Sequence, residues 1–203
     1  MKSEHSKNFS LVVIAIFFIG FAYITIKAIE ISDKTQISTS DGIYTNKVST
    51  SKEIASKAQE LTKNYQSELC EVQNILDYVT YIPYKINHFR ANSPQGTIQN
   101  NFGDCDDKSN LLISILHSLG KEAYFVLVPK HIFVIIHIKD KKLRKTKGLI
   151  IDGKKYFILE STAKGSRVGF PLRYRLDELN AIVEPFSNRT LVYDKLRYSV
   201  STH

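Results

Sequence analysis

Tryptophan is absent from this chain of 203 residues, and methionine occurs once, so the core must consist of Leu, Ile, Val, Phe and Tyr. Cysteine occurs only twice, at Cys70 and Cys105, which excludes a disulfide framework. Because CxxC and HxxxH spacings are also absent, we expect no structural zinc and no cofactor. A hydrophobic fraction of 43% excludes a wholly disordered chain, and the length suits one domain with accessory segments.

The formal charge is +8, but the basic residues are scattered except in the run Lys139–Lys147. Runs of charge are usually solvated, so we expect a solvated hairpin loop there. The alternative for this run is contact with an anionic surface, such as lipid headgroups or a cell-wall polymer. Nucleic acid is not an expected partner, because only the net charge would favour it.

The N-terminus contains the longest apolar run, Leu11–Ile26, which has no charged residue. With its flanks it approaches the ~20 residues that cross a bilayer. The exit from the run fits a small-residue cleavage site poorly, so we expect an uncleaved signal anchor over residues 1–29. A cleaved signal is the alternative, and a buried helix of a soluble fold is less compatible with the all-round apolar pattern.

The composition changes after this run. Residues 30–51 are rich in Ser, Thr, Asp and Lys, which predicts a flexible linker, and residues 52–203 form the expected domain. Lysines flank the apolar run on both sides, so the positive-inside rule decides little. The short N-terminal flank also carries the free amine, and we expect the N-terminus inside and the domain outside the cytoplasm.

Helical periodicity begins at the domain's start. We predict helices from Ser51 to about Lys63, from Ser67 to Tyr81, and from Cys105 to Leu119. The third has Asp104 as its N-cap and Gly120 as its stop. The segment 84–101 has no clear period and is predicted to be irregular, with a turn at Ser93-Pro94-Gln95-Gly96.

Strand patterns follow the third helix. They cover residues 122–128, 131–138, 149–151 and 156–160, with Asp152-Gly153 as a type I′ turn. This predicts an antiparallel sheet packed against the helix of Cys105, an α+β fold. In the tail we expect a short helix at 176–179 and a strand within 190–200.

Three residues suit thiol chemistry. Cys105 lies at a helix N-terminus, where unpaired N–H groups and the helix dipole favour a thiolate nucleophile. His131 begins a strand after a turn, and Glu160 ends a strand that could lie beside it. This order supplies a nucleophile, a base and an orienting acid. We expect a thiolate–imidazolium pair, on the assumption that the neighbouring Asp104, Asp106 and Asp107 are solvated and therefore screened.

Rival residues exist for two of these roles. His137 lies six residues beyond His131, about 20 Å along a strand, and only one of them can reach the thiol. His117 is too far along the helix to reach the Cys105 thiol. Asp152, the rival acid, lies in a hairpin turn, where Asp is favoured by the backbone conformation. The acidic residues around Cys105 could hold Ca²⁺, but helix capping explains them more simply.

The blocks GDCDDKSNLLISILHSLG, KHIFVII and YFILEST resemble those of the transglutaminase-like superfamily, whose fold is papain-like. The resemblance extends from about Leu69 to Pro171. It implies Cys105 as nucleophile, His131 as base and Glu160 as third member, where many relatives have Asp. For the oxyanion, the backbone N–H of Cys105 is one candidate donor, and Gln95 or Gln99 is a candidate for the other.

The implied reaction is acyl transfer from an amide through a thioester. The acceptor is water in a peptidase or amidase and an amine in a cross-linking enzyme, and the expected substrate is a protein or peptide. We therefore expect a membrane-anchored cysteine enzyme. The alternative is a catalytically silent module of the same fold that binds or assembles at the membrane.

Overall fold

The computed structural model describes residues 2–39, 42–86 and 91–200 and divides into two units, Met1–Gln36 and Ile37–His203. The first unit is the helix α1 (Lys2–Thr35). Its segment Leu11–Ile29 is long and apolar enough to cross a membrane, and none of it is buried within the protein. A signal sequence near an N-terminus meets the same criteria. The predicted apolar helix is therefore present, and its fate and orientation remain predictions.

Helices predicted from the pattern form the first layer of the second unit. They are α2 (Lys52–Thr62), α3 (Glu68–Tyr81) and α5 (Cys105–Ser118). Ser51, Ser67 and Asp104 cap them, each accepting a hydrogen bond from a backbone N–H of the first turn. Gly120 follows α5 with φ +70°, the left-handed conformation that ends many helices.

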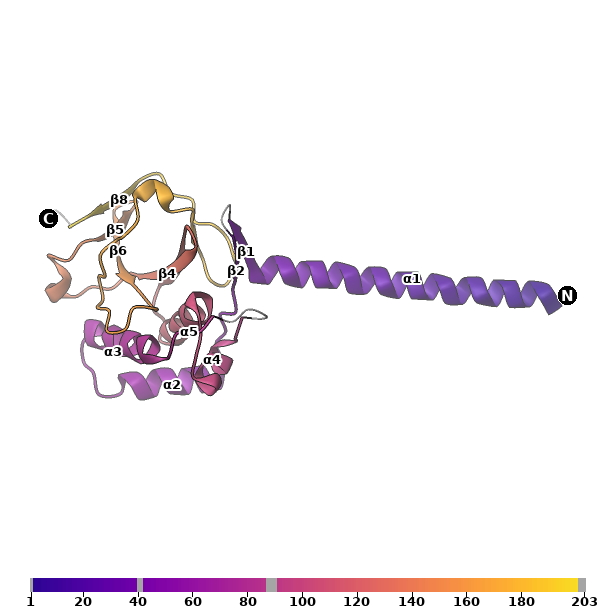
Figure 1. Ribbon diagram of the computed structural model, residues 1–203, viewed down its shortest axis with the longest axis horizontal. Helices are drawn as coiled ribbons and strands as arrows, with labels where there is room; N and C mark the ends of the chain where they lie inside the picture. The colour runs from indigo at the N-terminus through magenta and orange to yellow at the C-terminus, as the bar shows by residue number, and fades with distance from the viewer. Residues whose placement is uncertain (1, 40–41, 87–90, 201–203) are drawn as a thin grey trace. The chain divides into compact units, whose positions relative to one another are not determined.

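One helix was not predicted. The segment expected to be irregular contains α4 (Pro94–Asn100), with Ser93 as its cap. The sequence Ser-Pro is compatible with a turn and also with a helix start, because proline fits the first helical position. Figure 1 shows α5 between strand β4 on one side and the other helices of this unit on the other.

The second layer is a six-stranded antiparallel sheet with the order β7-β3-β4-β6-β5-β8. Its strands are β3 (Ala123–Val128), β4 (His131–Ile136), β5 (Gly148–Ile151), β6 (Lys154–Leu159), β7 (Ala181–Val183) and β8 (Leu196–Ser199). The α+β prediction is confirmed. The Asp152-Gly153 turn joins β5 to β6 with φ +46° and +85°, as a type I′ turn requires.

The run Lys139–Lys147 is not a hairpin loop, because the strands it connects, β4 and β5, are separated by β6. The run contains the short 3₁₀ helix η1 (Lys141–Leu143), and Leu143 is buried. In the tail, the predicted helix is η2 (Leu176–Glu178) and the predicted strand is shortened to β8. Strand β7 was not predicted, since three residues are too few for a periodic pattern.

The two faces of the sheet have separate cores. α5 packs on one face, where Leu112 and Leu116 belong to the same buried cluster as Ile132 and Val134 of β4. The other face carries a second cluster that includes Phe133 and Ile158. Successive strand residues point to opposite faces, so His131 and Glu160 belong by alternation to the side of Phe133 and Ile158.

Part of the segment expected to be a flexible linker is attached to the domain. It contains a two-stranded sheet of β1 (Gln36–Thr39) and β2 (Gly42–Thr45). The chain after β2 then follows α5: Lys47 N–H donates to Asn110 Oδ1 (2.9 Å), and Ser49 N–H donates to Ser114 Oγ (3.1 Å). The polar composition that suggested a linker here supplies partners for polar residues of α5.

Candidate active site

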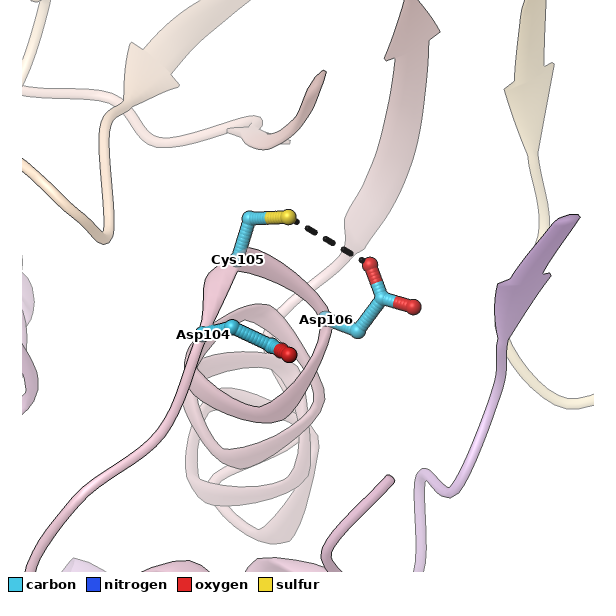
Figure 2. Close-up of side chains that lie close together, drawn as sticks. All are labelled: Asp104, Cys105 and Asp106. Atoms are coloured by element: carbon cyan, nitrogen blue, oxygen red, sulfur yellow. Dashed lines mark hydrogen bonds between the residues drawn. The ribbon is translucent and has the colours of Figure 1, made fainter. Parts of the chain in front are cut away.

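Cys105 is the first residue of α5 and is half-buried. Figure 2 shows its sulfur directed at the neighbouring carboxylate, and Sγ donates to Asp106 Oδ1 over 3.5 Å. The thiol is therefore protonated in this conformation. Burial comes first among the causes that raise its pKa, and the charges of Asp106 and Asp104 follow.

This finding differs from the expected thiolate, first because the thiol is largely buried and second because of the position of Asp106. That carboxylate is not solvated: its other oxygen, Oδ2, accepts from Thr45 N–H at the end of β2 (3.0 Å). Burial raises the pKa of Asp106 to about 6, against the opposing hydrogen bond from Thr45. A partly buried charge is weakly screened, so it disfavours the thiolate more than a surface carboxylate would.

The other two acidic residues beside Cys105 have structural partners. Asp104 caps α5 by accepting from Asp107 N–H (3.2 Å). Asp107 is buried and accepts from Asn92 through both its backbone N–H (2.6 Å) and its side-chain amide (3.0 Å). Possible ligand atoms of Asp104, Cys105 and Asp106 lie within 4.8 Å of one another. Each of these three residues takes part in a hydrogen bond, and the bond of Asp104 is the helix cap that the sequence predicted.

Gly103 leads into α5 at a position with no room for a side chain. A Cβ there would lie 2.7 Å from Asp107 Cβ and 3.3 Å from Thr97 Cγ2, both in buried residues. We expect Gly103→Ala to lower the free energy of unfolding by about 2 kcal/mol, because the first turn of α5 must shift. Denaturant unfolding of the full chain measures this. Gly20→Ala, which meets no atom within 4 Å, is the matched control, and equal midpoints for both variants would contradict the prediction.

His131 and Glu160 meet, as the sequence order implied. Strands β4 and β6 are neighbours in the sheet, and His131 Nε2 lies 2.9 Å from Glu160 Oε2. Both side chains are largely covered, with 19% and 12% of their surfaces exposed. The contact at Nε2 fixes the ring's orientation and makes Nδ1 the nitrogen for exchanging a proton with a thiol.

The Glu160 carboxylate is fixed from two directions. Its other oxygen, Oε1, accepts from the Thr162 backbone N–H (3.0 Å) and hydroxyl (2.5 Å). Burial on its own would raise the pKa of Glu160. The hydrogen bond and charge of His131, together with the Thr162 bonds, outweigh burial and hold that pKa below its ordinary value. Glu160 is therefore ionised at neutral pH and able to stabilise an imidazolium.

Two hydrogen bonds connect α5 to the elements around the His131–Glu160 pair. Ser109, one turn into the helix, shares a hydrogen bond with Ser161, which follows Glu160 (3.0 Å). Lys108 is buried, and its Nζ donates to the carbonyl oxygen of Ile82 after α3 (2.8 Å). Burial lowers the pKa of Lys108 to about 8, and the Glu160 charge opposes this. The helix that carries Cys105 is thus anchored close to the strand end that carries Glu160.

Cys105 and His131 themselves are not hydrogen-bonded. Within the part of the chain that the structure describes, the sulfur's hydrogen bond goes to Asp106. A residue close to both groups is Tyr174, whose pKa is raised by burial first and then by charges that include Glu160 and Cys105.

Tyr174 is a site residue that the sequence did not indicate. Its ring stacks on His131 (centroids 6.5 Å apart) and on Phe133 (6.4 Å). It comes from the loop before η2, where no spacing or motif connects it with the strands. Tyr84 is a second such residue: after burial, the Cys105 charge is the next cause that raises its pKa.

The rival residues have other partners. His137 Nδ1 lies 2.8 Å from the carbonyl oxygen of Lys155, and the His117 ring packs against Phe186. The Asp152 carboxylate accepts from the backbone of Asp194 and Lys195, which holds the chain ahead of β8.

The two glutamines predicted as oxyanion donors have different surroundings. The side-chain amide of Gln95 donates to Ser51 Oγ (2.5 Å), so it braces the start of α2 and is not directed at Cys105. Gln99 is exposed on α4, and its role stays a prediction. Both were considered because they precede Cys105 closely in sequence, but the unpredicted helix α4 carries them. The backbone N–H of Cys105 remains the other expected donor.

Together these features define a class of domain: an α+β fold with a cysteine at the start of a central helix and a histidine–carboxylate pair on adjacent strands. Residues 55–132 match the family model described as the transglutaminase-like superfamily. This part of the chain is therefore similar to the transglutaminase-like superfamily, as its motifs implied. The matched region includes Cys105 and His131 and ends before Glu160.

No curated protein matches the chain. Among solved structures it resembles a proposed cysteine protease from Cytophaga hutchinsonii, with 17% identity, a TM-score of 0.44, and coverage of 74% of this chain and 52% of that one. It also resembles a proposed protease from Parabacteroides distasonis ATCC 8503, with 16% identity, a TM-score of 0.45, and coverage of 68% of this chain and 27% of that one. The chain thus spans about half of the first protein's length and about a quarter of the second's.

Proposed function

We propose that this protein is a membrane-anchored cysteine enzyme that transfers acyl groups from amide bonds, with Cys105 as nucleophile, His131 as base and Glu160 as orienting acid. The observation that carries the proposal is the 2.9 Å contact between His131 Nε2 and Glu160. The match of the family model to the region of Cys105 and His131 adds support. Protein or peptide is the proposed substrate class.

In the proposed reaction, the Cys105 thiol turns from Asp106 and gives its proton to His131 Nδ1. The thiolate attacks the amide carbonyl carbon, and the negative charge that develops on the oxygen is met by the backbone N–H of Cys105. The C–N bond then breaks, and the imidazolium returns its proton to the leaving nitrogen. Water or an amine attacks the resulting thioester, which gives hydrolysis or cross-linking and frees the thiol.

The anchoring part of the proposal rests on α1. Its apolar segment Leu11–Ile29 has 19 residues, close to the ~20 that cross a bilayer. We propose that it stays attached as a signal anchor, with the N-terminus in the cytoplasm and the catalytic domain outside. Contact of the run Lys139–Lys147 with an anionic surface is a further proposal, favoured by its exposed lysines.

A catalytically silent binding module is the second candidate. The observation in its favour is the thiol–Asp106 hydrogen bond, together with the raised pKa of Cys105. Such a module would retain the fold and the His131–Glu160 contact but would never form a thioester.

Mass spectrometry separates the two candidates. Full-length protein in detergent micelles is incubated with candidate cell-surface proteins, and Cys105→Ala is compared with the matched variant Cys70→Ala. An enzyme gives new peptide termini if it hydrolyses and new isopeptide-linked masses if it cross-links, in Cys70→Ala but not in Cys105→Ala. Identical spectra from the two variants across the substrate set would reject the enzymatic proposal in favour of the module.

A further inference from the structure

A cavity of about 210 Å³ lies beside the His131–Glu160 pair. His131 and Glu160 form part of its lining, and residues of the loop after β6, including Tyr174, form another part. A cavity of about 150 Å³ with apolar walls is enough to bind benzene. The space next to His131 is therefore large enough for an aromatic ring or a branched aliphatic side chain.

The walls of this cavity combine an apolar part with a polar part. Phe133 and Ile158 line it from the sheet, and Phe170 and Leu172 line it from the loop. The carboxylate in the lining, Glu160, is already engaged by His131 and Thr162. An apolar side chain entering here would exchange water for these walls, which favours binding in proportion to the area covered.

A positive charge lies at the same cavity. Arg173 is exposed, and its guanidinium lies over the Phe170 ring, 4.7 Å from the centroid. No ion pair of Arg173 is found among residues 2–39, 42–86 and 91–200. Stacking on Phe170 orients the guanidinium without neutralising its charge, so a carboxylate bound beside the apolar group would meet a complementary partner.

The position of the cavity indicates which half of the substrate it binds. Its lining includes His131 and Glu160 but not Cys105. In the proposed reaction His131 protonates the leaving nitrogen, so the leaving half must lie on the histidine's side of the reaction centre. Building on the proposed function, we infer that this cavity binds the residue after the scissile bond. The inferred specificity is for an aromatic or large aliphatic side chain followed by a carboxylate.

Binding of product-like dipeptides tests this inference without requiring turnover. NMR titrations use full-length Cys105→Ala protein in detergent micelles with four probes: Phe-Asp-amide, Ala-Asp-amide, Phe-Asn free acid and Phe-Asn-amide. We expect Phe-Asp-amide to bind about 10-fold more tightly than Ala-Asp-amide, from the burial of the ring. We expect Phe-Asn-amide, which has no carboxylate, to bind about 3-fold more weakly than Phe-Asp-amide. Phe-Asn free acid distinguishes a chain-terminal carboxylate from a side-chain one.

Two variants assign the effects to the cavity. Phe170→Ala removes a wall, and Ala163→Phe fills the space from a lining position without removing a core side chain. Each should abolish the preference for Phe over Ala. Arg173→Ala should abolish only the carboxylate preference, and Arg197→Ala, which changes an exposed arginine of β8, should retain both.

Equal affinity for Phe and Ala dipeptides, or a preference that survives Ala163→Phe, would overturn the inference. The proposed function fails in a different way. Aromatic binding in the absence of amide chemistry would leave the cavity assignment intact and reject only the enzyme. Amide cleavage without any preference for the residue after the bond would reject only the cavity assignment.

Discussion

His131→Ala is expected to lower kcat for amide cleavage or cross-linking at least about 10³-fold, because it removes the base that activates the thiol and the acid that protonates the leaving nitrogen. The side chain is partly exposed and lies at the beginning of β4, so its removal should leave the core intact. Single-turnover rates and circular dichroism of the full-length variant measure activity and fold together. His137→Ala is the matched control, since His137 binds a backbone carbonyl at the other end of the same segment.

Glu160 provides a stricter test of the same pair. Glu160→Gln removes the charge that stabilises the imidazolium but retains an oxygen that can accept from Nε2. We expect a loss of about 10-fold to 100-fold in the wild-type background. In the His131→Ala background the same change should have almost no further effect, because residues that act as a unit are not additive. Additive losses in the double variant would show that Glu160 acts independently of His131 and would contradict the proposed triad.

The sequence predicted those parts of the protein that depend on local chemistry. Ser51, Ser67 and Asp104 are good caps followed by periodic apolar residues, and each does begin a helix. The contact between His131 and Glu160 could also be predicted from the sequence, because it requires only that β4 and β6 be neighbours. Such features depend on a few residues and on standard geometry.

Features that depend on distant contacts were not predictable. Asp106 was expected to be solvated, but its partner Thr45 lies 61 residues earlier, in a segment that looked like a linker. Tyr174 covers His131 from a loop with no periodic pattern. The β4–β5 connection looked like a hairpin because nothing local reveals that β6 inserts between those strands. In each case the outcome depended on tertiary packing, which the local sequence does not reveal.

Asp106 is also the residue with the second large expected effect. Asp106→Asn should increase the alkylation rate of Cys105 at pH 7 to 8 about 10-fold. The charge of Asp106 raises the pKa of the thiol, so its removal lowers that pKa and increases the thiolate fraction at a given pH. The amide oxygen can still accept from Thr45 N–H, which preserves the attachment of β2 to α5. Iodoacetamide labelling over a pH series, in a Cys70→Ala background, measures the shift, and Asp140→Asn, which changes the N-cap of η1, is the control.

Asp106→Asn should also change the free energy of unfolding, in a direction that the pKa of Asp106 determines. Burial raises the pKa of Asp106 to about 6, so the folded state holds this proton more tightly than the unfolded state does. The resulting stabilisation is complete below the unfolded pKa near 4 and is lost as the pH rises through about 6. Asp106→Asn should therefore be more stable than wild type by about 1–2 kcal/mol at pH 7, with a difference that disappears near pH 4. Faster labelling without this pH-dependent gain would contradict the raised pKa of Asp106, because Asn has the same size as Asp and leaves the covering of the sulfur unchanged. The absence of both effects would mean that the Asp106 charge does not control the ionisation of Cys105.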